Sequence, residues 1–86
     1  MASVFNDLVK KSLKAKRGKH PPIHSAHEGL ALIEEEVHEL RLEVFGRKRK
    51  GDPLRFLNEL VDIAALCEQF AEDIVAPTQR EHNAVD

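Results

Sequence analysis

The stretch that decides the fold is residues 24–44, HSAHEGLALIEEEVHELRLEV. Ser25 and Glu28 stand at the spacing of a capping box, in which two side chains satisfy free backbone amides at the start of a helix. Apolar residues then recur in alternating steps of three and four, a pattern typical of a helix in an antiparallel bundle: Leu30, Ile33, Val37, Leu40 and Val44. We therefore expect a helix over residues 26–45 that ends at Gly46.

Two further helices are expected, one on each side of this stretch. Residues 4–16 carry a narrow apolar stripe and are followed by Gly18 and two prolines, which should end the helix. Residues 53–75 follow Asp52, a favourable N-cap residue. No stretch has the pattern of a strand. The 86-residue chain is therefore predicted to be one all-α domain, a small antiparallel helical bundle of three main helices with a polar tail over residues 78–86.

The third helix is expected to need a partner from outside the chain. Its apolar residues cover about half of its circumference, which is more than one neighbouring helix buries: Leu54, Leu57, Leu60, Val61, Ala64, Cys67, Ala71, Ile74 and Val75. Domains of this size often complete their core by association. We expect a core completed by oligomerisation, in a homodimer or a dimer of dimers.

Composition excludes several classes of protein. The one cysteine, Cys67, rules out a disulfide framework and is expected to pack as a small apolar residue. Apolar runs are too short to span a membrane and no charged-then-apolar leader opens the chain, so we expect a cytoplasmic protein with no membrane partner. Acidic and basic residues are segregated along the sequence, unlike the uniformly basic surface of a nucleic-acid binder, so no nucleic-acid partner is expected.

Two pairs of carboxylates are the strongest functional signal. The expected second helix carries Glu36 and Glu39, and the third carries Glu59 and Asp62. Each pair is spaced i, i+3 and reaches off one helix face, where like charges repel unless a cation lies between them. A short linker makes the two helices antiparallel neighbours, so four oxygen ligands would surround one point, as in a site for Mg²⁺ or Mn²⁺. The alternative is a solvated acidic face, because glutamate is common on exposed helices.

These motifs resemble those of the MazG-like all-α nucleoside triphosphate pyrophosphohydrolases, in particular the small stand-alone members. The family pattern is EExxE, a spacer and then ExxD; residues 35–39 read EEVHE and residues 59–62 read ELVD. The resemblance implies hydrolysis of an NTP or dNTP to the monophosphate and pyrophosphate. It gives Glu35 a role in supporting a second metal or orienting the attacking water. It also implies that four acids bind Mg²⁺: Glu36, Glu39, Glu59 and Asp62.

Three basic residues are candidates for binding the substrate, and a di-iron site and a non-catalytic role are the alternatives to the predicted function. Arg47, Lys48 and Lys14 are candidates to bind the phosphate groups of the substrate, although cations at a helix C-terminus or in a turn need no ligand. Glu35 and His38 form an ExxH, half of a di-iron motif, but the third helix offers ExxD where the second half is needed. The alternative function is a non-catalytic helical module that dimerises or binds a nucleotide or metal.

Overall fold

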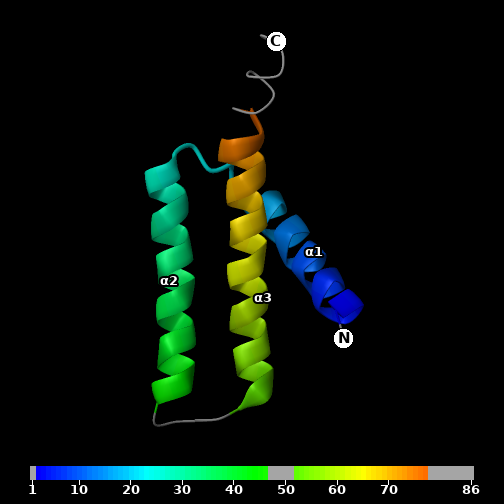
Figure 1. The fold of residues 1–86 in the computed structure, drawn as a ribbon, viewed down its shortest axis with the longest axis vertical. Coiled ribbons are helices and arrows are strands. Elements are labelled where there is room, and N and C mark those ends of the chain that lie inside the picture. The colour runs from blue at the N-terminus through cyan, green and yellow to red at the C-terminus, as the bar shows by residue number, and fades with distance from the viewer. Residues whose placement is uncertain (1, 47–51, 78–86) are drawn as a thin grey trace.

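The computed structural model describes residues 2–46 and 52–77, and within these ranges the chain forms helices and no strand (Figure 1). Helix α1 spans Ala2–Lys19, α2 spans Ala26–Phe45 and α3 spans Pro53–Phe70. A π-helical segment, η1, continues α3 over Ala71–Val75. Helices α2 and α3 lie antiparallel, and α1 packs obliquely on another side of α3 (Figure 1). The predicted all-α bundle is confirmed for these residues.

The starts of α2 and α3 follow the predicted capping residues. The backbone amide of Glu28 donates to Ser25 Oγ at 3.1 Å, and that of Leu54 donates to Asp52 Oδ1 at 3.0 Å. The Glu28 carboxylate accepts a hydrogen bond from the backbone amide of His24 at 2.9 Å. In a capping box the donor would be the amide of Ser25, which is the next residue. These bonds satisfy amides that have no partner within their helix.

Helix α1 is longer than the sequence indicated. It continues through Gly18 and ends at Lys19 instead of near residue 16. In its last turn, Arg17 Nη2 donates to Glu72 Oε1 at 2.8 Å and to Asp73 Oδ1 at 2.9 Å. These tertiary ion pairs hold the turn against η1 and offset the low helix propensity of glycine.

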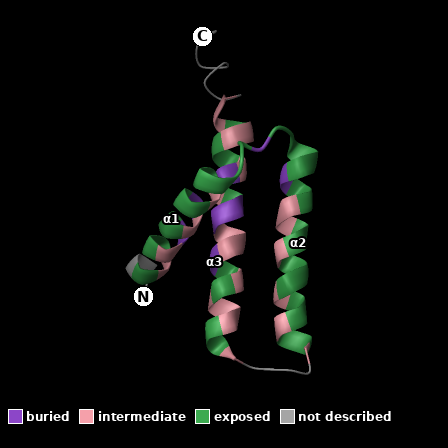
Figure 2. Ribbon diagram, turned by 180° about the vertical axis from the view of Figure 1, so that it is seen from behind, coloured by how far each residue is buried: buried purple, intermediate pink, exposed green. Residues whose placement is uncertain are grey.

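The core lies between α1 and α3. Its four buried residues are flanked by four partly buried ones: Val9, Leu13, Val61 and Ala65, then Phe5, Leu8, Leu57 and Ala64. Figure 2 shows the buried positions of α3 concentrated where α1 crosses it. Helix α1 therefore supplies part of the cover that the sequence analysis assigned to another subunit.

Helix α2 faces α3 with a different side from the predicted one. Its buried and partly buried positions are Gly29, Leu32, Ile33, Glu36, Leu40 and Glu43. Three of the residues predicted to form its core seam, Leu30, Val37 and Val44, are instead 55%, 47% and 38% exposed. The reason is the close approach of the two helices at Gly29, where the Phe70 ring fills the space that a Cβ atom would need.

Cys67 is also exposed, contrary to the prediction that it packs as an apolar residue. It lies on α3 between the side that faces α1 and the side that faces α2, so neither helix covers it. The predicted tail, residues 78–86, lies outside the described residues. Within the described part of the chain, no helix is both long enough and apolar enough to cross a membrane.

Replacing Gly29 by alanine is expected to destabilise the fold by about 1–3 kcal/mol, because the added methyl group must displace the Phe70 ring. Gly18→Ala is the matched control: Gly18 is also helical, and nothing lies within 4 Å of its Cβ position. There, the higher helix propensity of alanine should stabilise the protein by up to about 1 kcal/mol. Urea unfolding followed by circular dichroism measures both changes. Stabilisation by both substitutions would contradict a tight contact between Gly29 and Phe70.

Candidate metal centre

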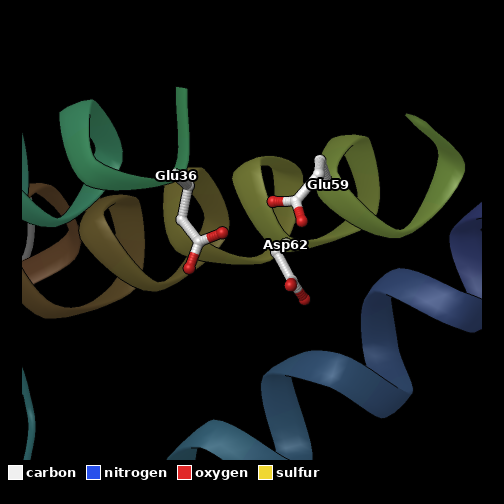
Figure 3. Close-up of side chains that lie close together, drawn as sticks. All are labelled: Glu36, Glu59 and Asp62. Atoms are coloured by element: carbon white, nitrogen blue, oxygen red, sulfur yellow. The ribbon is translucent and has the colours of Figure 1, made fainter. Parts of the chain in front are cut away.

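Three carboxylates from two helices converge along the contact between α2 and α3. Glu36, Glu59 and Asp62 each place one carboxylate oxygen within 4.8 Å of the other two, and all three residues are partly buried. Glu36 projects from α2, whereas Glu59 and Asp62 project from successive turns of α3 (Figure 3). The i, i+3 spacing on α3 and the antiparallel placement of α2 together produce this convergence.

Two oxygen atoms of this cluster have no hydrogen-bond donor. Glu36 Oε2 and Glu59 Oε2 are buried and accept no hydrogen bond from any described residue. A buried carboxylate oxygen without a partner is costly. A proton on Glu59 would let the two carboxyl groups hydrogen-bond to each other, and a cation bound to both would remove the same cost.

The electrostatics of the cluster favour added positive charge. The pKa of Glu59 is raised to about 7, first by burial and then by the negative charges of its neighbours, Glu39, Glu36 and Asp62. Burial also raises the pKa of Glu36, helped by the charges of Glu39 and Asp62 and opposed by Lys16. A bound cation would lower both pKa values, because it favours the charged form of each carboxyl group.

Helix α1 adds two side chains to the rim of the cluster, and the sequence analysis assigned a role to neither. Ser12 Oγ donates to Asp62 Oδ1 at 3.0 Å, which fixes one carboxylate. Lys16 acts on Glu36 through its charge. Both stand on the side of α1 that carries its buried residues, Val9 and Leu13. Residues 9, 12, 13 and 16 are spaced so that they share one face of a helix. This spacing could therefore have identified Ser12 and Lys16 from the sequence.

The other predicted metal and catalytic residues lie around this cluster. Glu39 is exposed and lies outside the group of three converging oxygens, although its charge still raises the pKa of Glu59. Glu35 is exposed and lines the adjoining cavity. The structure therefore brings together three of the four predicted metal ligands and leaves Glu39 one turn along α2.

The predicted phosphate-binding residues lie further away or outside the described ranges. Lys14 is exposed and is rotated by roughly 160° around α1 from Lys16. The helical period therefore turns Lys16 toward the cluster and Lys14 away from it, and a phosphate-binding role for Lys14 stays a prediction. Arg47 and Lys48 are not among the described residues, and their role stays a prediction.

A cavity of about 420 Å³ opens beside the cluster, with Glu36 in its wall. Lys16 and His20 add polar groups, and Leu32 and Leu66 add apolar surface. This volume falls within the range of small-molecule sites. The cavity joins the end of α1, the segment that follows it, α2 and α3.

Asp73 holds the wall of this cavity in place. Its Oδ1 accepts from Arg17 and its Oδ2 accepts from the backbone amide of Ile23, each at 2.9 Å. Burial acts to raise the pKa of Asp73, but the hydrogen bonds from Arg17 and Ile23 lower it overall. One carboxylate of η1 thus links α1 and the segment before α2 to η1.

Comparisons of the chain with protein-family models, with curated proteins and with solved structures found no match.

The metal-free protein is expected to lose stability as the pH rises from 4.5 to about 7, to a greater extent than its Glu59→Gln variant. In the folded state Glu59 holds its proton above the ordinary pKa of 4.5, so its contribution is complete below that pH and is lost as the pH passes about 7. Glutamine does not titrate, which removes this part of the pH dependence. Urea unfolding in EDTA at several pH values measures the difference. Identical pH dependence in both proteins would show that Glu59 has an ordinary pKa.

Proposed function

We propose that this protein is a Mg²⁺-dependent nucleoside triphosphate pyrophosphohydrolase, in line with its resemblance to the MazG-like proteins. The observation that carries the proposal is the convergence of Glu36, Glu59 and Asp62, two of which have buried oxygens without a donor. The adjoining cavity supports it, because its volume suits a small organic ligand next to the bound ion.

The donor set fits a hard divalent cation. The three converging groups are all carboxylates, and no histidine or cysteine belongs to this cluster of described residues. Oxygen ligands of this kind favour Mg²⁺ or Mn²⁺ over softer transition metals. Mg²⁺ normally keeps several waters, so three protein carboxylates leave positions for water and phosphate. Glu39 adds negative charge one turn along α2.

The residues around the cluster have complementary roles in this proposal. When bound, Mg²⁺ would neutralise phosphate charge and lower the pKa of a water molecule. Ser12 holds Asp62 in the orientation needed for a ligand. Lys16 presents a positive charge to the phosphate chain from the α1 side. Glu35, in the cavity wall, is the proposed base that accepts the proton of the attacking water.

Cleavage between the α and β phosphates is the part of the proposal that comes from the resemblance. The charges of the site are consistent with it, because the clustered carboxylates and Lys16 can together balance a divalent cation and a polyphosphate. The cavity beside Glu36 would hold the nucleoside, with Leu32 and Leu66 against its apolar surfaces.

Mg²⁺ binding should weaken by about tenfold or more in Glu59→Gln and in Asp62→Asn, because an amide is a poorer ligand and does not balance the charge of the ion. Asp7→Asn is the control, since it removes an exposed carboxylate from α1 outside the cluster. Isothermal titration calorimetry measures all three variants against the unchanged protein. Equal affinity in every variant would remove this cluster from consideration.

Nucleoside triphosphates incubated with the protein and Mg²⁺ should yield a monophosphate and pyrophosphate. Glu35→Gln should reduce turnover by about a hundredfold or more if Glu35 is the base, and Asp62→Asn should lose most activity. Asp7→Asn should retain it. A coupled assay that distinguishes pyrophosphate from orthophosphate reads the products. Orthophosphate without pyrophosphate would contradict α–β cleavage, and no turnover with intact Mg²⁺ binding would favour the non-catalytic binding module.

A further inference from the structure

Gln69 is a buried polar side chain to which the proposed mechanism gives no role. It belongs to α3 and lines the cavity beside the carboxylate cluster, yet it is only 4% exposed. A buried amide is costly unless its hydrogen-bonding groups find partners. Three other polar residues of the lining, His20, Glu28 and Glu35, are exposed to solvent. Of these four residues, Gln69 therefore depends most on partners within the fold or on a ligand.

Gln69 stands on the same stripe of α3 as the two carboxylates of the cluster. Glu59, Asp62, Leu66 and Gln69 follow one another in steps of three, four and three residues, so they share one face of the helix. At 1.5 Å per residue, Gln69 lies about 10 Å along α3 from Asp62. Leu66, which also lines the cavity, lies between them. The cavity therefore extends along α3 from the cluster toward the amide.

Asp73 fixes the orientation of this amide. A hydrogen bond from the Gln69 side chain is among the causes that lower the pKa of Asp73. An ionised carboxylate accepts and does not donate, so the amide nitrogen of Gln69 is the atom that faces Asp73. Asp73 stands outside the group of described residues that line the cavity. The nitrogen is therefore directed away from the cavity, which leaves the carbonyl oxygen, Oε1, to face a ligand.

We infer that Gln69 makes this site select a nucleobase that carries an exocyclic amino group, which is adenine or cytosine. The inference rests on the proposed nucleotide substrate and names the class of its base. With the phosphates held at the cluster, the base lies further along α3, at a distance comparable with the separation of Asp62 and Gln69. There, Oε1 of Gln69 accepts a hydrogen bond from the amino group of the base.

A keto group in the place of the amino group makes this contact unfavourable. Hypoxanthine and uracil carry an oxygen where adenine and cytosine carry the amino group, so two acceptors would face each other. A buried acceptor that is left without a donor is costly. Sites built to hydrogen-bond a substrate group discriminate strongly against an analogue that lacks it. The apolar side chains of Leu32 and Leu66 cannot distinguish the two groups, so the discrimination depends on Gln69.

Binding of nucleoside monophosphates tests the inference, because the proposed reaction forms these compounds and does not consume them. In Mg²⁺, titration calorimetry should show an amino base bound about tenfold more tightly than its keto analogue, AMP over IMP or CMP over UMP. The pair that shows the preference identifies the base as a purine or a pyrimidine. Equal affinity within both pairs, or no binding of any of the four, would overturn the inference. Release of pyrophosphate from triphosphates tests the proposed function separately.

Gln69→Met should bring the two affinities of the preferred pair close to equality, since methionine has a similar length but no carbonyl oxygen. Asn58→Met is the matched control, because Asn58 is an exposed amide of α3 outside the cavity lining. It should keep the tenfold preference. Circular dichroism confirms that both variants stay helical. An unchanged preference in Gln69→Met would overturn the role of Gln69.

Asp73→Asn tests the fixed orientation of the amide. Asparagine both donates and accepts, so it no longer holds the nitrogen of Gln69 toward residue 73, and the preference for the amino base should fall close to equality. Glu72→Gln is the control: it removes the other carboxylate that accepts from Arg17 and leaves Asp73 in place. The control should keep the preference. The same preference in both variants would overturn the orienting role of Asp73.

Discussion

Helix α3 is the element on which both other helices pack, and the rest of the structure depends on this shared contact. One side of α3 is apolar and buries Val61 and Ala65 against α1. Another side carries Glu59 and Asp62 toward α2, where they meet Glu36. The hydrophobic contact with α1 therefore fixes where Glu59 and Asp62 lie relative to α1, because these two carboxylates project from the same helix as Val61 and Ala65.

The carboxylate cluster opposes the stability of this small chain, and other contacts offset its cost. Burial and mutual repulsion raise the pKa values of Glu59 and Glu36, so the ionised cluster is unfavourable without a cation. Asp73 acts in the opposite direction: its hydrogen bonds to Arg17 and Ile23 tie three segments together. The repulsion among the carboxylates is thus balanced by attractive contacts of Asp73, which lie in a different part of the fold.

The hairpin separates two kinds of surface. Its α1 side holds the carboxylates, the cavity and Lys16, whereas its opposite side holds the exposed residues around Val37.

Much of this organisation is local and was determined by the sequence. Ser25 and Asp52 set the starts of two helices, and the i, i+3 spacing placed Glu59 and Asp62 on one face of α3. Helix α2 has apolar residues on two sides, so its sequence pattern allows either side to face α3. The tertiary structure decided which side does. The contact between Gly29 and Phe70 selects one.

That choice exposes Val37, brings Glu36 into the cluster and leaves Glu39 outside it. The tertiary structure also brought Ser12 to Asp62 across 50 residues of sequence. No local pattern relates two helices that are distant in the chain. The sequence by itself therefore determined the helices and the spacing of their carboxylates, and long-range packing decided which of these side chains share a site.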